Sequence, residues 1–374
     1  MLNRMHTLSI TLLLITSPCT ATNHFLQKFS CQKRVAPSLF HKHTSKAQPL
    51  VISTIYKNFT VTEPVLIDLF ESPIMERIKY VRQYGVSDYV IKQKKEYTRY
   101  EHCVGVWALL RMYGATIEEQ IAGLLHDASH TVFSHVGDLV FNHHSMQSSY
   151  QDDIHAWYLQ QYEIDILLEK HNISLDSIVH KNGLHTMLEQ DLPHICADRL
   201  EYNLQAGILT NMLTHDDINT ILEHLRYSDG DWFFTNTESA KKLALVSLFN
   251  TEHVWSSPAS DFIYNLTAHA LRRALEIKLL TIEDIHFSTD PIVWDKLWIS
   301  NDATIANCMQ KIVNYEQNPQ LYDTASLLVG KFRGLDPLVQ KNDQLVKLTH
   351  IDAEYCKEYN RVKARLIHSK TAEL

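Results

Sequence analysis

The sequence has few of the residues that break regular structure: glycine and proline each occur only 10 times in 374 residues. Soluble proteins use roughly 7% glycine and 5% proline on average, so a fold of many short strands and tight turns is not favoured. Helices form best where such residues are rare. We therefore expect an all-α protein, a helical bundle with one small β-hairpin and additional C-terminal helices.

Cysteine is also scarce, and its positions exclude two kinds of site. No CxxC pair occurs, and the spacing gives no disulfide framework, so neither a thiolate zinc site nor a disulfide-stabilised fold is supported. A reducing compartment is compatible with this pattern. The six cysteines are Cys19, Cys31, Cys103, Cys196, Cys308 and Cys356.

A long apolar run is missing as well. The stretch LSITLLLI, residues 8–15, is much shorter than the roughly 20 residues that a membrane helix needs, so we expect no transmembrane span. A basic start, this apolar stretch and the small residues of TSPCTATN have the layout of a secretory signal. The same leader also fits an organelle transit peptide, or a tail that targets nothing.

Acidic residues are absent from residues 1–62, which contain seven lysines and arginines, although the whole chain has a net charge of −8. The rest of the chain is therefore strongly acidic, which argues against a surface that wraps nucleic acid. We expect a cytoplasmic site of action, with export or organelle import left open by the leader. Three regions are predicted: an N-terminal extension at 1–60, a core at 61–235 and a C-terminal helical region at 236–374.

Capping and periodicity signals place several helices in the core. Ser72 and Pro73 open one that Gly85 ends, and another covers residues 99–113. Thr116 and Glu119 form a capping-box pattern for a third helix, which leads directly to His126. The remaining predictions are helices over 151–162 and 198–209, a helix capped by Thr214 and Asp217, and a hairpin over 226–235.

The most informative residues are two histidines and two aspartates near the ends of these helices. Imidazole and carboxylate ligands suit one divalent ion such as Mn, Fe, Zn or Mg, which lowers the pKa of bound water and neutralises phosphate oxygens. A single member of the set is weak evidence in a chain with 22 histidines. Together they predict a metal-dependent phosphohydrolase. The four residues are His102, His126, Asp127 and Asp198.

Three segments carry a family resemblance. ESPIMERIKYVRQYG (71–85), TRYEHCVGV (98–106) and IAGLLHDASHTVFSHVGD (121–138) resemble the HD-domain metal-dependent phosphohydrolases, and most closely their deoxynucleoside triphosphate triphosphohydrolase branch. The resemblance covers roughly residues 61–205. It implies an HD-type helical core at 61–235, in which the two histidines and two aspartates named above are the metal ligands.

The resemblance also implies roles for further residues. His130 would be the catalytic histidine, Asp138 its orienting carboxylate, and His155 a second histidine that protonates the leaving oxygen. A His–Asp pair is suited to this, because the carboxylate sets the tautomer and pKa of the imidazole. The expected substrate-binding residues are Gln83, Arg99, Arg199 and Tyr202.

The chain departs from the family pattern at two informative positions. Ala206 stands where the deoxynucleotide-selecting branch has a carboxylate, which puts recognition of a sugar 3′-hydroxyl in doubt. Ser129 replaces the glycine after His-Asp. We expect a small phosphorylated substrate, and a deoxynucleoside triphosphate is the best specific prediction. The alternatives are an HD-type nucleotide phosphatase or phosphodiesterase, and a non-catalytic metal-binding nucleotide sensor or scaffold. The apolar C-terminal region also suggests a homo-oligomer.

Overall fold

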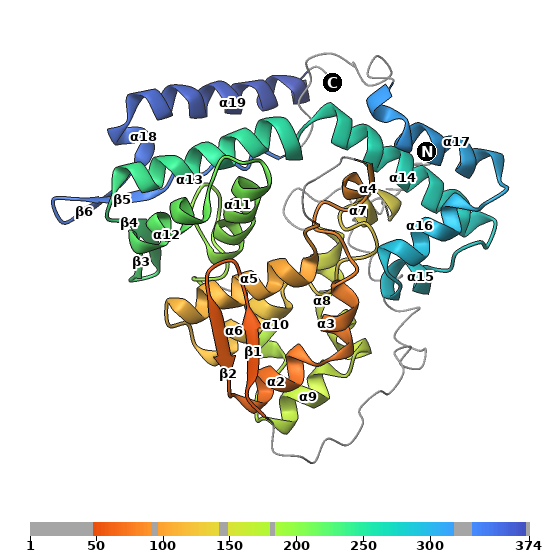
Figure 1. Ribbon diagram of the computed structural model, residues 1–374, viewed down its shortest axis with the longest axis horizontal. Coiled ribbons are helices and arrows are strands. Elements are labelled where there is room, and N and C mark those ends of the chain that lie inside the picture. Colours follow the sequence, from red (N-terminus) through yellow and green to blue (C-terminus); the bar gives the residue numbers. More distant parts are fainter. Residues whose placement is uncertain (1–47, 91–95, 142–148, 180–183, 318–330, 372–374) are drawn as a thin grey trace, which may run out of the picture. The chain divides into compact units, whose positions relative to one another are not determined.

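A computed structural model describes residues 48–90, 96–141, 149–179, 184–317 and 331–371, and within these ranges the chain is mostly helical (Figure 1). The all-α prediction is therefore confirmed, with small sheets added. The first helices are α2 (Pro64–Phe70), α3 (Pro73–Ile78), α4 (Ser87–Val90), α5 (Arg99–Met112), α6 (Ile117–Leu125), α7 (Val136–Val140), α8 (Tyr150–Gln161), α9 (Ile164–Lys170), α10 (Asp176–Val179), α11 (Ala197–Leu209) and α12 (His215–Glu223). The later ones are α13 (Thr237–Asn250), the π-helix η1 (Thr251–Trp255), α14 (Pro258–Glu276), α15 (Ile282–Phe287), α16 (Asp290–Trp298), α17 (Ala303–Val313), the 3-10 turn η2 (Tyr315–Gln317), α18 (Leu348–Ile351) and α19 (Ala353–Thr371).

A two-stranded antiparallel hairpin precedes the helices, formed by β1 (Leu50–Ser53) and β2 (Asn58–Val61). Phe59 of β2 is buried, and its ring meets Trp107 of α5 edge-on at a centroid distance of 5.3 Å. The predicted boundary at residue 60 therefore falls inside β2. The hairpin packs as part of the core that follows it.

Helices α5 and α6 pack against each other, and α11 packs against α5. Thr98 and Glu101 form a complete capping box at the start of α5. Thr116 caps α6, but Glu119 does not return a bond to it. The carboxylate of Glu119 instead accepts hydrogen bonds from the backbone nitrogens of Met187 and Leu188, at 2.8 and 3.1 Å. The predicted start of α6 is confirmed, and its capping box is only half present.

The helix predicted from Pro73 to Gly85 is shorter than expected, because α3 ends at Ile78. Beyond it the chain pairs with the segment that leads into α5: Arg99 N donates to Val81 O, and Gln83 N donates to Tyr97 O. This pairing satisfies backbone groups that a continued helix would have satisfied internally. It also brings residues 81–83 beside the first turn of α5.

The predicted hairpin is present as β3 (Leu225–Ser228) and β4 (Asp231–Phe234), joined by Asp229 and Gly230, which both have positive φ. It belongs to a larger sheet than the sequence indicated. Strand β5 (Leu338–Lys341) pairs in parallel with β4, and β6 (Gln344–Lys347) completes the strand order β3-β4-β5-β6. A segment far along the chain therefore joins the predicted core.

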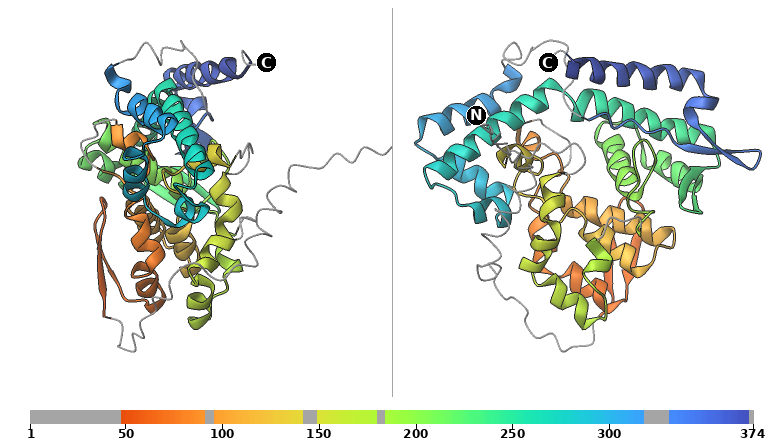
Figure 2. Two further views of the ribbon diagram at one scale, coloured as in Figure 1. Left: turned by 90° about the vertical axis from the view of Figure 1, so that its right-hand side faces the viewer. Right: turned by 180° about the vertical axis from the view of Figure 1, so that it is seen from behind.

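The C-terminal helices contact the core at two places. Helix α13 packs against α11 of the core, and α19 in turn runs alongside α13 (Figure 1), where Arg361 and Arg365 pair with the buried carboxylate of Glu252 in η1. Helices α14 and α17 pack closely together, and their apolar side chains share one buried cluster with Phe133 and Val136, just after the His-Asp motif. The described parts of the C-terminal region therefore belong to one compact unit with the core (Figure 2). None of the helices in the described ranges is both long and apolar enough to cross a membrane.

Candidate metal centre

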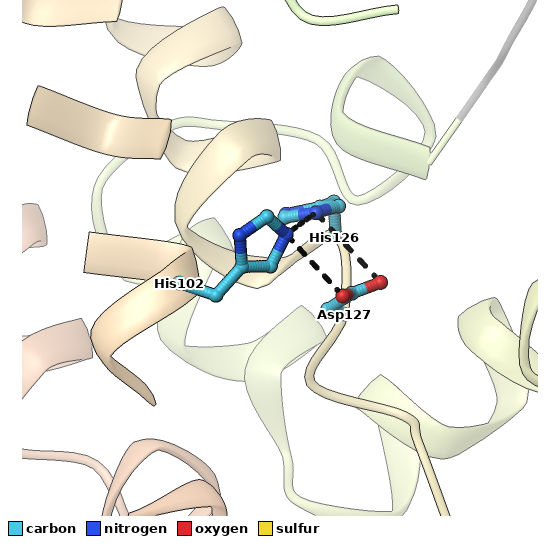
Figure 3. Close-up of side chains that lie close together, drawn as sticks. All are labelled: His102, His126 and Asp127. Carbon is cyan, nitrogen blue, oxygen red and sulfur yellow. Dashed lines mark hydrogen bonds and ion pairs between the residues drawn. The ribbon is translucent and has the colours of Figure 1, made fainter. Parts of the chain in front are cut away.

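The four predicted metal ligands come from three helices whose ends converge. His102 lies in the first turn of α5, His126 is the C-cap residue of α6 with Asp127 directly after it, and Asp198 is the second residue of α11. Figure 3 shows His102, His126 and Asp127 turned toward one another. The α6 helix ends at Leu125, and this break allows two consecutive side chains to point to the same centre.

The predicted ligand atoms lie close together. Nε2 of His102 lies 3.2 Å from Nε2 of His126 and 3.1 Å from Oδ1 of Asp198. Oδ2 of Asp127 lies 3.5 Å from Nε2 of His102, and Oδ1 of Asp198 lies 3.5 Å from Nε2 of His126. Two ligands about 2.1 Å from the same ion are about 3.0–3.4 Å apart in octahedral or tetrahedral geometry. His102, His126 and Asp127 are therefore close enough to share an ion, and Asp198 lies next to both histidines.

Both histidines are held by a contact on the opposite side of the ring. Nδ1 of His126 lies 2.8 Å from the carbonyl oxygen of Gly123, and Nδ1 of His102 lies 2.5 Å from Oε2 of Glu201. Such outer contacts fix ring orientation and leave Nε2 toward the ion. Burial alone would lower the pKa of His102, but its contacts with Asp198 and Glu201 raise that pKa to about 9.

Glu201 is a residue that the sequence prediction missed. Its side chain is fully buried, and the hydroxyl of Tyr97 also donates to it. Burial raises the pKa of Glu201, which the hydrogen bonds from His102 and Tyr97 oppose. The available signal was its position three residues after Asp198, on the same face of α11. Gly105 provides the space, since a Cβ there would lie 2.3 Å from Oε1 of Glu201.

Arg99 lies on the predicted face but is already engaged. Its Nη1 pairs with Oδ2 of Asp127, its Nε donates to Oγ of Ser134 at 3.0 Å, and the whole side chain is buried. Burial opposes ionisation of Asp127, yet Arg99 and the neighbouring histidines hold its pKa well below the usual range. In this structure Arg99 supports a metal ligand.

His130 lies beside this group and is neutral over a wide pH range. Its Nε2 is 3.4 Å from Oδ1 of Asp127, and burial together with the charge of Arg99 lowers its pKa to about 3. Asp138 reaches it only indirectly: Oδ2 of Asp138 lies 3.1 Å from Nδ1 of His135, whose ring meets that of His130 edge-on at 4.9 Å. The sequence prediction paired Asp138 directly with His130 and missed His135.

The other predicted residues lie around the same centre. His155 of α8 is 2.8 Å from the hydroxyl of Ser129, and Tyr202 of α11 lies between His102 and Trp255, at ring-centroid distances of 6.4 and 5.2 Å. The backbone carbonyl oxygen of Gln83 accepts a hydrogen bond from Nη2 of Arg99 at 3.4 Å. Among the described residues, the buried side-chain oxygen Oε1 of Gln83 has no hydrogen-bond partner.

Arg199 is turned away from the ligands and holds a neighbouring loop. Its Nη2 pairs with Oε1 of Glu189 at 2.9 Å, and its Nη1 donates to the carbonyl oxygen of His194 at 3.1 Å and to the sulfur of Cys196. Glu189, Cys196 and Asp198 are themselves close enough to share an ion. Burial strongly raises the pKa of the Cys196 thiol, and the charge of Arg199 beside it opposes this shift.

Comparisons with known proteins agree with this arrangement. The HD domain family matches residues 99–191. The chain is 32% identical to the uncharacterized protein YdhJ of Bacillus subtilis over 76% of this chain and 86% of that one, and 29% identical to the metal-dependent phosphohydrolase cns2 of Cordyceps militaris over 77% and 81%. Over only 20% of this chain and 14% of the other, it is 32% identical to the deoxynucleoside triphosphate triphosphohydrolase SAMHD1 of Xenopus laevis.

Solved structures show the same fold at low sequence identity. A hypothetical protein from Aquifex aeolicus superimposes with a TM-score of 0.62 over 85% of this chain and 100% of its own, at 15% identity. A phosphohydrolase from Bacteroides thetaiotaomicron gives a TM-score of 0.60 over 82% of this chain and 95% of its own, also at 15% identity. With the matched domain and these relatives, the chain belongs to the HD-domain metal-dependent phosphohydrolases.

Proposed function

We propose that this phosphohydrolase acts on a nucleotide through one divalent ion held by His102, His126, Asp127 and Asp198. The observation that supports this most strongly is that the ligand atoms of His102, His126 and Asp127 lie close enough to share an ion, with the carboxylate of Asp198 next to both histidines. A bound divalent ion would lower the pKa of a water molecule and neutralise phosphate charge. The identity of the metal, among Mn, Fe, Zn and Mg, stays open.

The surrounding side chains would transfer protons and bind the substrate. Neutral His130 can accept a proton or a hydrogen bond beside Asp127, and His155 would protonate the leaving oxygen. Tyr202 would stack on a sugar or base, and the unpaired Oε1 of Gln83 would accept a hydrogen bond from the substrate. Arg99 would contribute positive charge near the phosphates from its pair with Asp127, and Arg199 would have to leave its pair with Glu189 to contact them.

A deoxynucleoside triphosphate is the best specific substrate, cleaved to release intact triphosphate. The combination of His130, Asp138 and His155 and the short match to a deoxynucleoside triphosphate triphosphohydrolase support it. Ala206 weakens one part of it, because this buried methyl group cannot accept a bond from a sugar 3′-hydroxyl. A nucleotide phosphatase or phosphodiesterase is therefore the second candidate.

The full chain loaded with Mn tests these alternatives with a panel of deoxy- and ribonucleotides, whose products are separated by chromatography. Intact triphosphate from a deoxynucleotide would support the first candidate, and inorganic phosphate or a cleaved diester the second. His130→Ala should reduce turnover by about 10²–10⁴-fold with metal content unchanged. His215→Ala, at an exposed position of α12, is the matched control and should leave both unchanged. A fully metal-loaded protein that turns over none of the panel would favour a non-catalytic nucleotide sensor.

A further inference from the structure

A buried serine connects the His-Asp segment to helix α8. The hydroxyl oxygen of Ser129 lies 2.8 Å from Nδ1 of His155 and 2.5 Å from Oε1 of Gln151. It also lies 3.3 Å from the backbone oxygen of Gln151. Ser129 is completely buried, and Gln151 is 7% exposed. Gln151 and His155 are one helical turn apart, so both face the same hydroxyl group.

The hydrogen atoms available in this contact determine which ring nitrogen of His155 is protonated. A serine hydroxyl has one hydrogen to donate. The side-chain nitrogen of Gln151 donates to Oδ1 of Asp152 at 2.9 Å, which sets the amide so that its oxygen faces Ser129. Both Gln151 oxygens near the hydroxyl are acceptors, so the serine hydrogen points to Gln151. The serine oxygen can then only accept from His155, and Nδ1 of His155 must carry a hydrogen.

We propose that Ser129 is a positioning residue that holds His155 in its Nδ1–H form and leaves Nε2 as the nitrogen that exchanges protons with the substrate. The second half of this statement rests on the proposed function. In the imidazolium form, the Nε2–H bond breaks as a new O–H bond forms on the leaving oxygen, and the ring becomes neutral with Nδ1–H retained. The hydrogen bond from Nδ1–H to Ser129 is the same before and after the transfer. The ring can therefore lose and regain its proton at Nε2 without flipping.

The side chain at position 129 is therefore more than a tolerated replacement of glycine. Glycine or alanine has no hydroxyl, so Nδ1 of His155 would lose its fixed partner and both neutral tautomers would become accessible. A neutral ring protonated at Nε2 cannot accept a proton there. Removing the hydroxyl should thus affect the catalytic step more than the binding of substrate.

The tautomer can be measured directly in the full chain. With ¹⁵N-labelled histidine, two-bond ¹H–¹⁵N spectra distinguish Nδ1–H from Nε2–H rings, and His155→Gln identifies the signal. We expect an Nδ1–H ring in the wild type, with and without added Zn, and a shift toward a mixture of tautomers in Ser129→Ala. Ser247→Ala removes another buried hydroxyl, which donates to the carbonyl oxygen of Arg333, and should leave the His155 signal unchanged.

Kinetics test the role in the reaction. On the best substrate of the panel, Ser129→Ala should lower kcat about 10-fold or more and change KM less than about 3-fold. An Nε2–H ring in the wild type, or an unchanged tautomer in Ser129→Ala, would overturn the proposal. A changed tautomer with unchanged kcat would overturn the role of Nε2. If Ser129→Ala does not fold, Ser129→Gly and the wild-type spectrum still decide the tautomer. A confirmed tautomer in a chain that hydrolyses no phosphorylated substrate would refute the proposed function while leaving the assignment of Ser129 intact.

Discussion

The buried carboxylate of Glu201 contacts the predicted ligand His102 on the side of the ring that faces away from the other ligands. Two oriented contacts meet on this side chain, one from Nδ1 of His102 and one from the hydroxyl of Tyr97. A carboxylate in this position fixes the tautomer of the ligand and increases its basicity toward the ion. The hydroxyl of Tyr97 also lies 3.2 Å from Nδ1 of His102, so these three buried side chains form one network.

Replacing Glu201 by Gln should therefore weaken metal binding without removing a ligand. We expect metal affinity to fall about 10–100-fold, as measured by competition with a chelator of known affinity. Glu119→Gln is the matched control, because Glu119 is also buried but accepts from the backbone of Met187 and Leu188. It should lower stability only. Wild-type affinity in Glu201→Gln would show that this carboxylate does not support the ligand.

Gly105 offers a second test of the same contact. A methyl group at this position would lie 2.3 Å from Oε1 and 2.6 Å from Cγ of Glu201, which is held on both sides. Gly105→Ala should therefore lower the thermal stability and the metal affinity together, with overpacking costing about 1–3 kcal/mol. Gly207→Ala on α11 collides only with the side chain of Leu213 and should lower stability alone. Equal metal affinity in both variants would contradict the proposed link.

The sequence indicated the four proposed metal ligands but not the side chains that contact them, for a physical reason. Ligands belong to a small set of residue types and recur at an ordered spacing, so His102, His126, Asp127 and Asp198 were visible as a pattern. Glu201 and His135 are ordinary surface-type residues, and their placement beside His102 and His130 depends on how α11 and the segment after His130 pack. The engagement of Arg99 with Asp127 likewise follows from three-dimensional placement.

Among the elements, α15 supports the His-Asp segment from the C-terminal region. Val132 N donates to the carbonyl oxygen of Ile285, and the hydroxyls of Tyr150 and Tyr158 on α8 reach Nε2 and the carbonyl oxygen of His286, respectively. The Nδ1 atom of His286 lies 2.8 Å from Ile282 O. Neutral His286 satisfies both of its neighbours, donating from Nδ1 and accepting at Nε2.

Burial of His286 makes the free energy of unfolding depend on pH over a defined range. Burial lowers the pKa of His286 to about 4, whereas an unfolded histidine has a pKa of about 6.5. Between these values the unfolded chain binds a proton that the folded chain does not, so stability falls as the pH drops. Through this histidine, the free energy of unfolding decreases by about 2 kcal/mol between pH 7 and pH 5.

His286→Gln removes this contribution and should be less stable than the wild type at pH 7. Its unfolding free energy, from denaturant titrations at pH 7 and pH 5, should decline about 2 kcal/mol less than that of the wild type. His350→Gln, at an exposed position of α18, should keep the wild-type decline. Parallel wild-type and His286→Gln curves would mean that this histidine does not titrate in the window.

Element boundaries were predictable where local signals decide them. Thr116 caps α6, and Asp229 with Gly230 forms the hairpin turn, as the sequence indicated. The early end of α3 and the parallel pairing of β4 with β5 were not predictable, because both depend on partners that are distant along the chain or outside a helix pattern. Local rules fix how an element starts more reliably than what it pairs with.

At the scale of the whole molecule, segments at both ends of the described chain complete the predicted core. Strands β5 and β6 extend the sheet of β3 and β4, and the β1–β2 hairpin covers α5. The phenol oxygen of Tyr56, in the turn of that hairpin, is buried, and burial together with the charge of Glu201 raises the pKa of this phenol well above the usual value. The hairpin is therefore packed against the core through Phe59 and Trp107, although the predicted boundary at residue 60 lies within it.

If the hairpin is part of the core, a single buried side chain within it should matter to the whole fold. Phe59→Ala removes the ring that packs on Trp107 and should reduce the unfolding free energy by about 3 kcal/mol or more. Val51→Ala in the partner strand removes a side chain that is 64% exposed, and should change it by less than about 0.5 kcal/mol. The loss in Phe59→Ala should shift far-UV circular dichroism and tryptophan fluorescence transitions together, because one cooperative unit is weakened. A wild-type unfolding curve for Phe59→Ala would instead mean that the β1–β2 hairpin contributes little to the stability of the core.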